Sequence, residues 1–185
     1  MRRMADEQLE RMFPDLDLDA FWEDSEYAED TYRGGFPTDE VVVSVEAELG
    51  FRLPASYVAL MRARNGGMPR NTCCPAPSST TWSEDHVALT AIMGIGREKE
   101  CSLAGRSGSR FLIEEWGYPA IGVYFADCPS AGHDMIAFDY RDCGPEGEPR
   151  VVHVDQEVGY RITVLAPDFV GFVRALRPES DYDFD

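Results

Sequence analysis

Three apolar runs of strand length, separated by turn-rich segments, constrain the fold of this chain more than any other feature. They cover residues 121–125, 135–140 and 150–154. Asp, Pro, Ser and Gly fill the segments between them, and a Gly/Pro-rich loop joins the second run to the third. This hairpin-type spacing predicts a mainly antiparallel sheet, with a further strand at residues 161–165.

Helical patterns flank these runs. The clearest pair covers residues 39–49 and 54–64: Thr38 or Asp39 can cap the first helix, Gly50 follows it, and Pro54 suits the first turn of the second. Weaker patterns predict a short helix near residues 9–16, a helix from about 19 to 32 and a closing helix. The closing helix has the apolar face Phe169, Val170, Phe172, Val173 and Leu176.

The order of elements along the chain, with helices first, then strands and then one helix, predicts an α+β fold. In this fold N-terminal helices and a C-terminal helix pack on a mainly antiparallel sheet. At 185 residues the chain is expected to form one domain, residues 1–185. Within it we expect an acidic helical extension at about 1–33 and a frayed acidic tail at 178–185. The other expectations are an extended loop with short edge pieces at 68–85, a strand at 87–93 and a mobile loop at 97–110.

Charge is the strongest compositional feature. The chain has 34 acidic and 17 basic residues, a formal net charge of −17. Residues 1–32 alone hold 3 arginines and 11 acids, which gives 3 − 11 = −8. Such a field repels nucleic acid and anionic membranes and attracts basic partners, so direct nucleic-acid binding is not expected. Solubility alone is the alternative explanation of the charge.

The sequence is typical of a cytoplasmic protein. No apolar run approaches the ~20 residues that span a bilayer, and the basic start Met1-Arg2-Arg3-Met4 is followed by acids instead of an apolar segment. The five cysteines include no CxxC pair, which indicates reduced thiols instead of a disulfide framework or a structural zinc site.

One group of polar residues invites a catalytic interpretation. Strand alternation suggests that Asp139, His153 and Asp155 lie close together, near a loop with His133 and Asp134. A His/Asp cluster is what a metal hydrolase or an acid–base site needs. However, HExxH and G-x-S-x-G motifs are absent, and a Cys–His interpretation of the cysteine before Pro129 would need a lowered thiol pKa. We therefore interpret these groups as structural and predict no catalytic residue, cofactor or metal.

The order of several motifs is similar to that of the SUKH superfamily, which includes fungal Smi/Knr-type cell-wall-synthesis regulators and many bacterial relatives. Residues 46–57, ending in Asn65-Gly66-Gly67, resemble the opening signature of that superfamily. The later blocks also look like its bacterial members, and the similarity spans roughly residues 21–176. These blocks are residues 94–98, 115–119, 129–134 and 152–157.

The resemblance implies an α+β fold and a binding function. Many bacterial members are immunity proteins that block a polymorphic toxin, often a nuclease or deaminase, and the family has no established catalytic residues. We therefore expect a non-enzymatic module that binds a basic toxin domain. The alternatives are a regulatory or scaffold module that recruits partners through its acidic N-terminal segment and, with less support, a His/Asp hydrolase. The predicted partner-binding residues are Trp116, Tyr118, Asp127, His133, Asp134, Asp139, His153 and Asp155.

Overall fold

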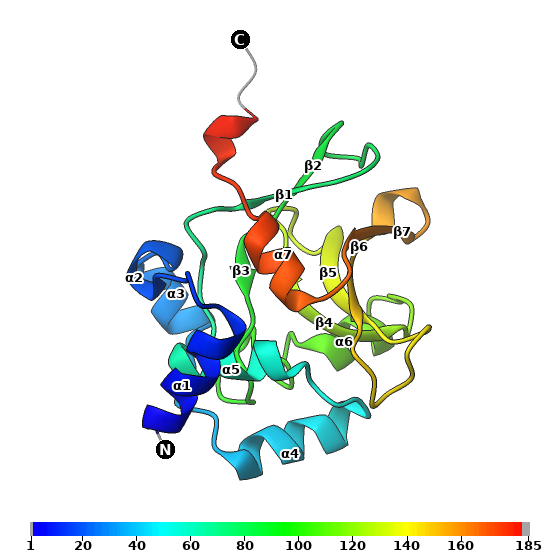
Figure 1. The fold of residues 1–185 in the computed structure, drawn as a ribbon. Helices are drawn as coiled ribbons and strands as arrows, with labels where there is room; N and C mark the ends of the chain where they lie inside the picture. Colours follow the sequence, from blue (N-terminus) through cyan, green and yellow to red (C-terminus); the bar gives the residue numbers. More distant parts are fainter. Residues whose placement is uncertain (1, 183–185) are drawn as a thin grey trace.

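A five-stranded antiparallel sheet forms the centre of the computed structural model, which describes residues 2–182, with side chains from Asp6 onward. Its strands follow the chain in the order β3-β4-β5-β6-β7 (Figure 1). The apolar runs and the predicted α+β class are thus confirmed. The bounds are β3 (Ala91–Ile92), β4 (Gly122–Asp127), β5 (Asp134–Asp139), β6 (Arg150–Asp155) and β7 (Arg161–Ala166).

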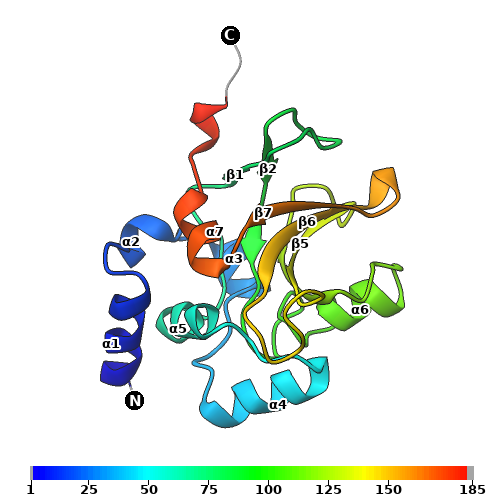
Figure 2. The ribbon, with the colours of Figure 1, turned by 45° about the vertical axis from the view of Figure 1, so that its right-hand side comes forward.

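Aromatic side chains fasten two helices to one face of this sheet. Tyr57 of α5 (Ala55–Ala63) and Phe169 of α7 (Phe169–Ala175) both pack against Phe125 and Phe138, which stack with ring centroids 4.0 Å apart. The rings bury large apolar areas, which makes them the main source of packing energy at this contact. Helix α6 (Ser109–Glu114) lies on the opposite side of the sheet (Figure 2).

The predicted helix pair is present with its predicted ends. Helix α4 (Asp39–Leu49) begins where the Thr38 hydroxyl accepts the Val41 N–H at 3.4 Å, and it ends at Gly50. Helix α5 begins directly after Pro54. The caps satisfy backbone groups that a helix end would otherwise leave without partners.

The acidic N-terminal segment is folded against the body of the protein. It contains α1 (Arg2–Met12), α2 (Leu18–Phe21) and α3 (Glu26–Thr31), so the single helix predicted from about residue 19 to 32 is wrong. The helix is interrupted because Trp22 bridges to Pro69 and Ser25 caps a new start. Leu9 and Phe13 anchor α1 beside α5, and Trp22 is only 2% exposed.

Three further predictions differ from the structure. The strand expected at 87–93 is split between β2 (His86–Ala88), which pairs with β1 (Cys73–Pro75), and β3 of the main sheet. The loop at 97–110 forms bonded turns in which Leu103 is fully buried. In the tail, η2 (Glu179–Asp181) is a short 3₁₀ helix, and the Tyr182 ring packs 4.1 Å from that of His86. Residues 183–185 lie outside the described residues.

Candidate functional site

The pairing of β5 with β6 decides which of the predicted polar residues meet. Asp134 lies opposite Asp155 and Ile136 lies opposite His153, whereas Asp139 lies opposite Arg150. Cross-strand partners share a face, so Asp139 points to the other side of the sheet from His153. The predicted grouping of Asp139 with His153 and Asp155 is therefore wrong. The alternation of side chains shows which residues of one strand share a face. Only the pairing register of two strands shows which of their residues lie on the same face of the sheet.

Asp139 belongs to a separate ion-pair cluster at the other end of the hairpin. Arg141 donates to its carboxylate from Nε at 2.9 Å and from Nη2 at 2.8 Å, and Arg150 Nε donates at 2.9 Å. Burial raises the pKa of Asp139, but the hydrogen bonds from these arginines outweigh it and hold the pKa at about 2. The Asp139 carboxylate thus links β5 to β6 through its hydrogen bonds with these arginines.

His153 and Asp134 form a buried pair inside the sheet. The imidazole Nε2 lies 2.6 Å from Asp134 Oδ2, and both side chains are almost completely inaccessible to solvent. Asp155, also buried, accepts hydrogen bonds from Thr81, at 3.1 Å from N and 2.5 Å from Oγ1. These bonds hold the β1–β2 loop against the end of β6.

Cys128, Asp134 and His153 are the described residues whose donor atoms lie close enough together to suggest a metal, all within 4.8 Å of one another. Their donor types suit zinc. His153 Nδ1 and Asp134 Oδ1 also have no hydrogen-bond partner among the described residues. Burial and the neighbouring Asp134 raise the pKa of the Cys128 thiol, so a metal bound here would have to displace the thiol proton. The contacts that the structure does contain are those of a buried hydrogen-bonded cluster.

The remaining predicted contact residues differ in exposure. Trp116 is 37% exposed, and His133 is exposed and bonded to the carboxylate of Glu157. Tyr118 is buried and donates its hydroxyl to the Gly132 carbonyl at 2.6 Å. The pair His133 and His153 required by a two-histidine hydrolase is therefore divided between the surface and the interior. Partner contact by these residues stays a prediction, and for the buried ones it would be indirect.

Asp127 connects the N-terminal segment to the end of β4. The Tyr32 hydroxyl donates to its carboxylate at 2.7 Å. Burial raises the pKa of Asp127 to about 6, against the opposing effect of the Tyr32 hydrogen bond. A carboxyl group with a pKa raised on folding binds its proton more tightly in the native state.

This raised pKa predicts a pH dependence of stability. Asp127 contributes stability that is fully present below about pH 3.8 and is lost as the pH rises through about 6. Asp127→Asn should remove this contribution. Between pH 4 and 7 the free energy of unfolding of the wild type should therefore fall by about 2–3 kcal/mol relative to that of the variant. Urea unfolding of both proteins across that range tests it, with the exposed Asp30→Asn as control. Parallel pH profiles of wild type and Asp127→Asn would contradict the assignment.

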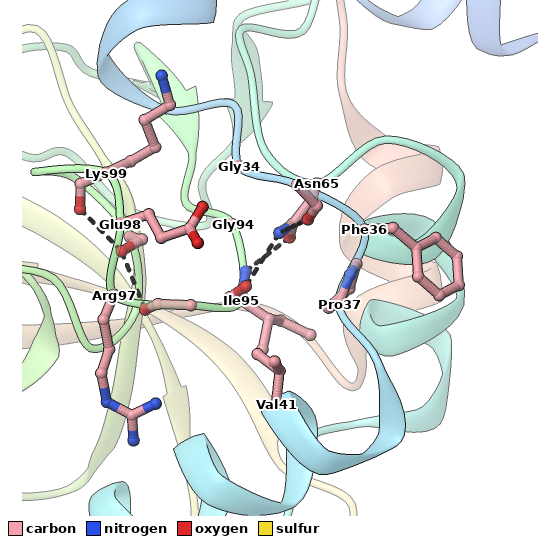
Figure 3. A pocket seen from close by; sticks show the side chains of 13 residues that line it. Gly34, Phe36, Pro37, Val41, Asn65, Gly94, Ile95, Arg97, Glu98 and Lys99 are labelled. Atoms are coloured by element: carbon pink, nitrogen blue, oxygen red, sulfur yellow. Dashed lines mark hydrogen bonds between the residues drawn. The ribbon is translucent and has the colours of Figure 1, made fainter.

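A pocket that the sequence analysis did not identify lies between three segments of the chain. Its volume is about 260 Å³, and it is lined by the loop at 34–37, Val41 at the start of α4, Asn65, and the turns at 94–102 (Figure 3). Asn65 forms its floor: Nδ2 donates to the carbonyls of Gly35 at 2.7 Å and Ile95 at 2.9 Å, and Oδ1 accepts the Ile95 N–H at 2.7 Å.

Two glycines allow the chain to approach this closely. A Cβ on Gly66, at φ 92°, would lie 2.6 Å from the Tyr32 carbonyl oxygen, and one on Gly94 would lie 2.6 Å from that of Asn65. Any other residue would push these segments apart. The sequence signal was present in the runs Asn65-Gly66-Gly67 and Gly94-Ile95-Gly96. Taken singly, the first run is typical of a helix end and the second of a turn.

The charged side chains around the pocket are not equivalent. Arg97 Nε donates to Glu48 at 2.8 Å, and Lys99 Nζ donates to the backbone carbonyls of Glu29 at 2.7 Å and Asp30 at 3.1 Å. Both cations point away from the pocket, whereas the Glu98 carboxylate is turned toward it (Figure 3). Glu98 forms no ion pair or side-chain hydrogen bond with any described residue.

The helices α1–α3 and their connections expose many carboxylates, and Lys99 of the pocket contacts the end of α3. Arginine pairs neutralise Asp24 and Glu29. Six others are exposed and make neither an ion pair nor a side-chain hydrogen bond with a described residue, and we call these six the acidic layer. They are Asp6, Glu10, Asp15, Asp19, Glu26 and Asp30.

Comparison with known families gives one match. The model of the SMI1 / KNR4 family (SUKH-1) matches residues 37–175, well over half of the chain. No curated protein matches the chain. The acidic layer precedes the matched region, whereas most of the pocket lies within it. No helix among the described residues is long and apolar enough to cross a membrane.

Proposed function

We propose that this chain, which belongs to the SMI1/KNR4 family (SUKH-1), is a non-enzymatic module that binds a basic protein. The acidic layer carries this proposal. Its six carboxylates are exposed on one docked segment and have no arginine partners among the described residues. Complementary charge of this kind speeds association with a basic surface and selects against acidic partners.

Packing of the segment supports a binding role more than simple solubility. Leu9, Phe13, Trp22 and Tyr32 are buried under the acidic layer, so its carboxylates are presented from an ordered surface. A surface that is ordered before binding loses less conformational entropy when a partner docks. Carboxylates that serve only solubility need no such support.

The partner that we propose is a toxin domain of the nuclease or deaminase type, neutralised in the cytoplasm of the producing cell. Enzymes that act on nucleic acid present basic surfaces, because their substrates are polyanions. An acidic protein of immunity type can cover such a surface and exclude the substrate. This role agrees with the one implied by the resemblance to bacterial SUKH proteins.

The test uses whichever product of the neighbouring genes has nuclease or deaminase activity in a purified assay. Its nuclease or deaminase activity is measured with increasing amounts of the purified chain in low salt, with polyglutamate at the same total charge as the control. We expect inhibition that is complete near equimolar chain and is absent with polyglutamate. Full toxin activity at a tenfold excess of folded chain would overturn the immunity role.

A further inference from the structure

We propose that the pocket floored by Asn65 binds an arginine side chain of the protein partner. This inference rests on the proposed function, since it assigns the site at which a basic partner is anchored. The cavity volume of about 260 Å³ is far above the ~10–15 Å³ that a single water needs, so it admits an extended side chain. Arginine is also enriched among the anchor residues of protein interfaces.

The electrostatics of the pocket favour a cation. Glu98 is the charged lining residue without a partner among the described residues, and its carboxylate faces the cavity (Figure 3). Arg97 is engaged by Glu48, and Lys99 by the end of α3, so neither cation offsets Glu98 inside the pocket. A guanidinium can place a charge-assisted hydrogen bond on this carboxylate.

The apolar part of the lining suits the rest of an arginine side chain. Val41, Ile95 and Pro37 line the cavity, and Phe36 at its rim is 39% exposed. Arginine buries its methylene groups along such surfaces while its charged head reaches a polar group.

An anion fits this pocket poorly, although two glycine-rich turns line it. The Ile95 N–H, which could point at a phosphate, is already bound by Asn65 Oδ1 at 2.7 Å. Glu98 would in addition repel a negative group. The Ile95 N–H is thus used in the hydrogen bond to Asn65 and is not available to an oxyanion.

The pocket lies where a partner on the acidic layer would reach it. Lys99, which lines the cavity, binds the backbone carbonyl of Asp30, a member of that layer. A basic surface lying over α3 can therefore extend one side chain into the cavity. The long-range attraction of the layer and the short-range fit of the pocket would act on the same partner.

The test is an NMR titration of the full chain with N-acetyl-arginine amide in low salt. We expect saturable shifts of the backbone amides of Gly34, Gly35, Gly94 and Gly96, which line the cavity. N-acetyl-citrulline amide, a neutral molecule of nearly the same shape, should bind at least about fivefold more weakly. Glu98→Gln should weaken arginine binding by a similar factor, and the exposed Glu115→Gln should leave it unchanged.

Three results would overturn the assignment. They are equal binding of the arginine and citrulline amides, an unchanged affinity in Glu98→Gln, and tighter binding of inorganic phosphate at the same amides. Because these probes require no toxin, a failure here would remove the arginine pocket and leave the acidic-layer proposal standing. Conversely, arginine binding without inhibition of any toxin would separate the pocket from the immunity role.

Discussion

Replacing Asn65 by leucine is expected to lower the free energy of unfolding by about 3 kcal/mol. The side chain is 5% exposed, and its amide satisfies both the N–H and the carbonyl of Ile95. Leucine has a similar shape but leaves these two buried backbone groups without partners, at a cost of about 1–3 kcal/mol each. The Gly35 carbonyl, the third partner, lies on an exposed residue and can turn to water.

Urea unfolding followed by tryptophan fluorescence measures this effect. Asn71→Leu is a matched control, because Asn71 is exposed and its side chain makes one long hydrogen bond, of 3.5 Å, within the part of the chain that the structure describes. That control should change stability by no more than about 0.5 kcal/mol. Equal effects of the two substitutions would show that the Asn65 amide does not hold the pocket floor.

Replacing His153 by leucine is expected to lower the free energy of unfolding by about 3–5 kcal/mol. The substitution leaves the Asp134 carboxylate buried without the partner that lies 2.6 Å away. Removing both members, as Asp134→Leu with His153→Leu, should recover a large part of the loss, since no uncompensated polar group then remains. The interaction energy in this double-mutant cycle should exceed about 1 kcal/mol.

His133→Leu is the matched control for this prediction. His133 also pairs with a carboxylate, that of Glu157, but both side chains are about half exposed. Its loss should therefore cost less than about 1 kcal/mol. Strictly additive effects of the Asp134 and His153 substitutions would contradict a coupled buried pair.

Local sequence signals predicted the regular elements well. Thr38, Gly50 and Pro54 fix the ends of α4 and α5 through backbone hydrogen bonds and permitted dihedral angles, which depend on near neighbours alone. The predicted helix at 19–32 is broken because Trp22 meets Pro69, a distant contact. Likewise, residues 87–93 read as one strand, although their two ends pair with different strands.

The candidate site was less predictable because its parts are far apart in the sequence. Asn65, Gly35 and Ile95 are each about 30 residues from their hydrogen-bond partners. Singly, an Asn-Gly-Gly run indicates a helix end and a Gly-Ile-Gly run indicates a turn. Their joint role appears only when the fold brings the two turns together around one amide.

Burial also changes how the N-terminal segment should be tested. Deleting residues 1–32 would remove Trp22 and Tyr32, which are each 2% exposed. Loss of binding after such a deletion would then reflect damage to the fold. Neutralising exposed carboxylates removes the charge and keeps the packing.

The most direct test of the central claim is the rate of association with a product of the neighbouring genes that the chain is found to inhibit. Stopped-flow measurements at about 20 and 200 mM salt compare the wild type with two variants, each changing four exposed carboxylates to amides. One variant alters the acidic layer at Asp6, Glu10, Asp15 and Asp19, and the control alters Glu84, Glu115, Glu179 and Asp181.

We expect the acidic-layer variant to associate about tenfold more slowly at low salt and to lose most of its salt dependence. The control variant, with the same net charge, should stay close to the wild type. Equal slowing of both variants would mean that net charge alone attracts the partner. Unchanged rates in the acidic-layer variant would contradict the claim that this surface receives it.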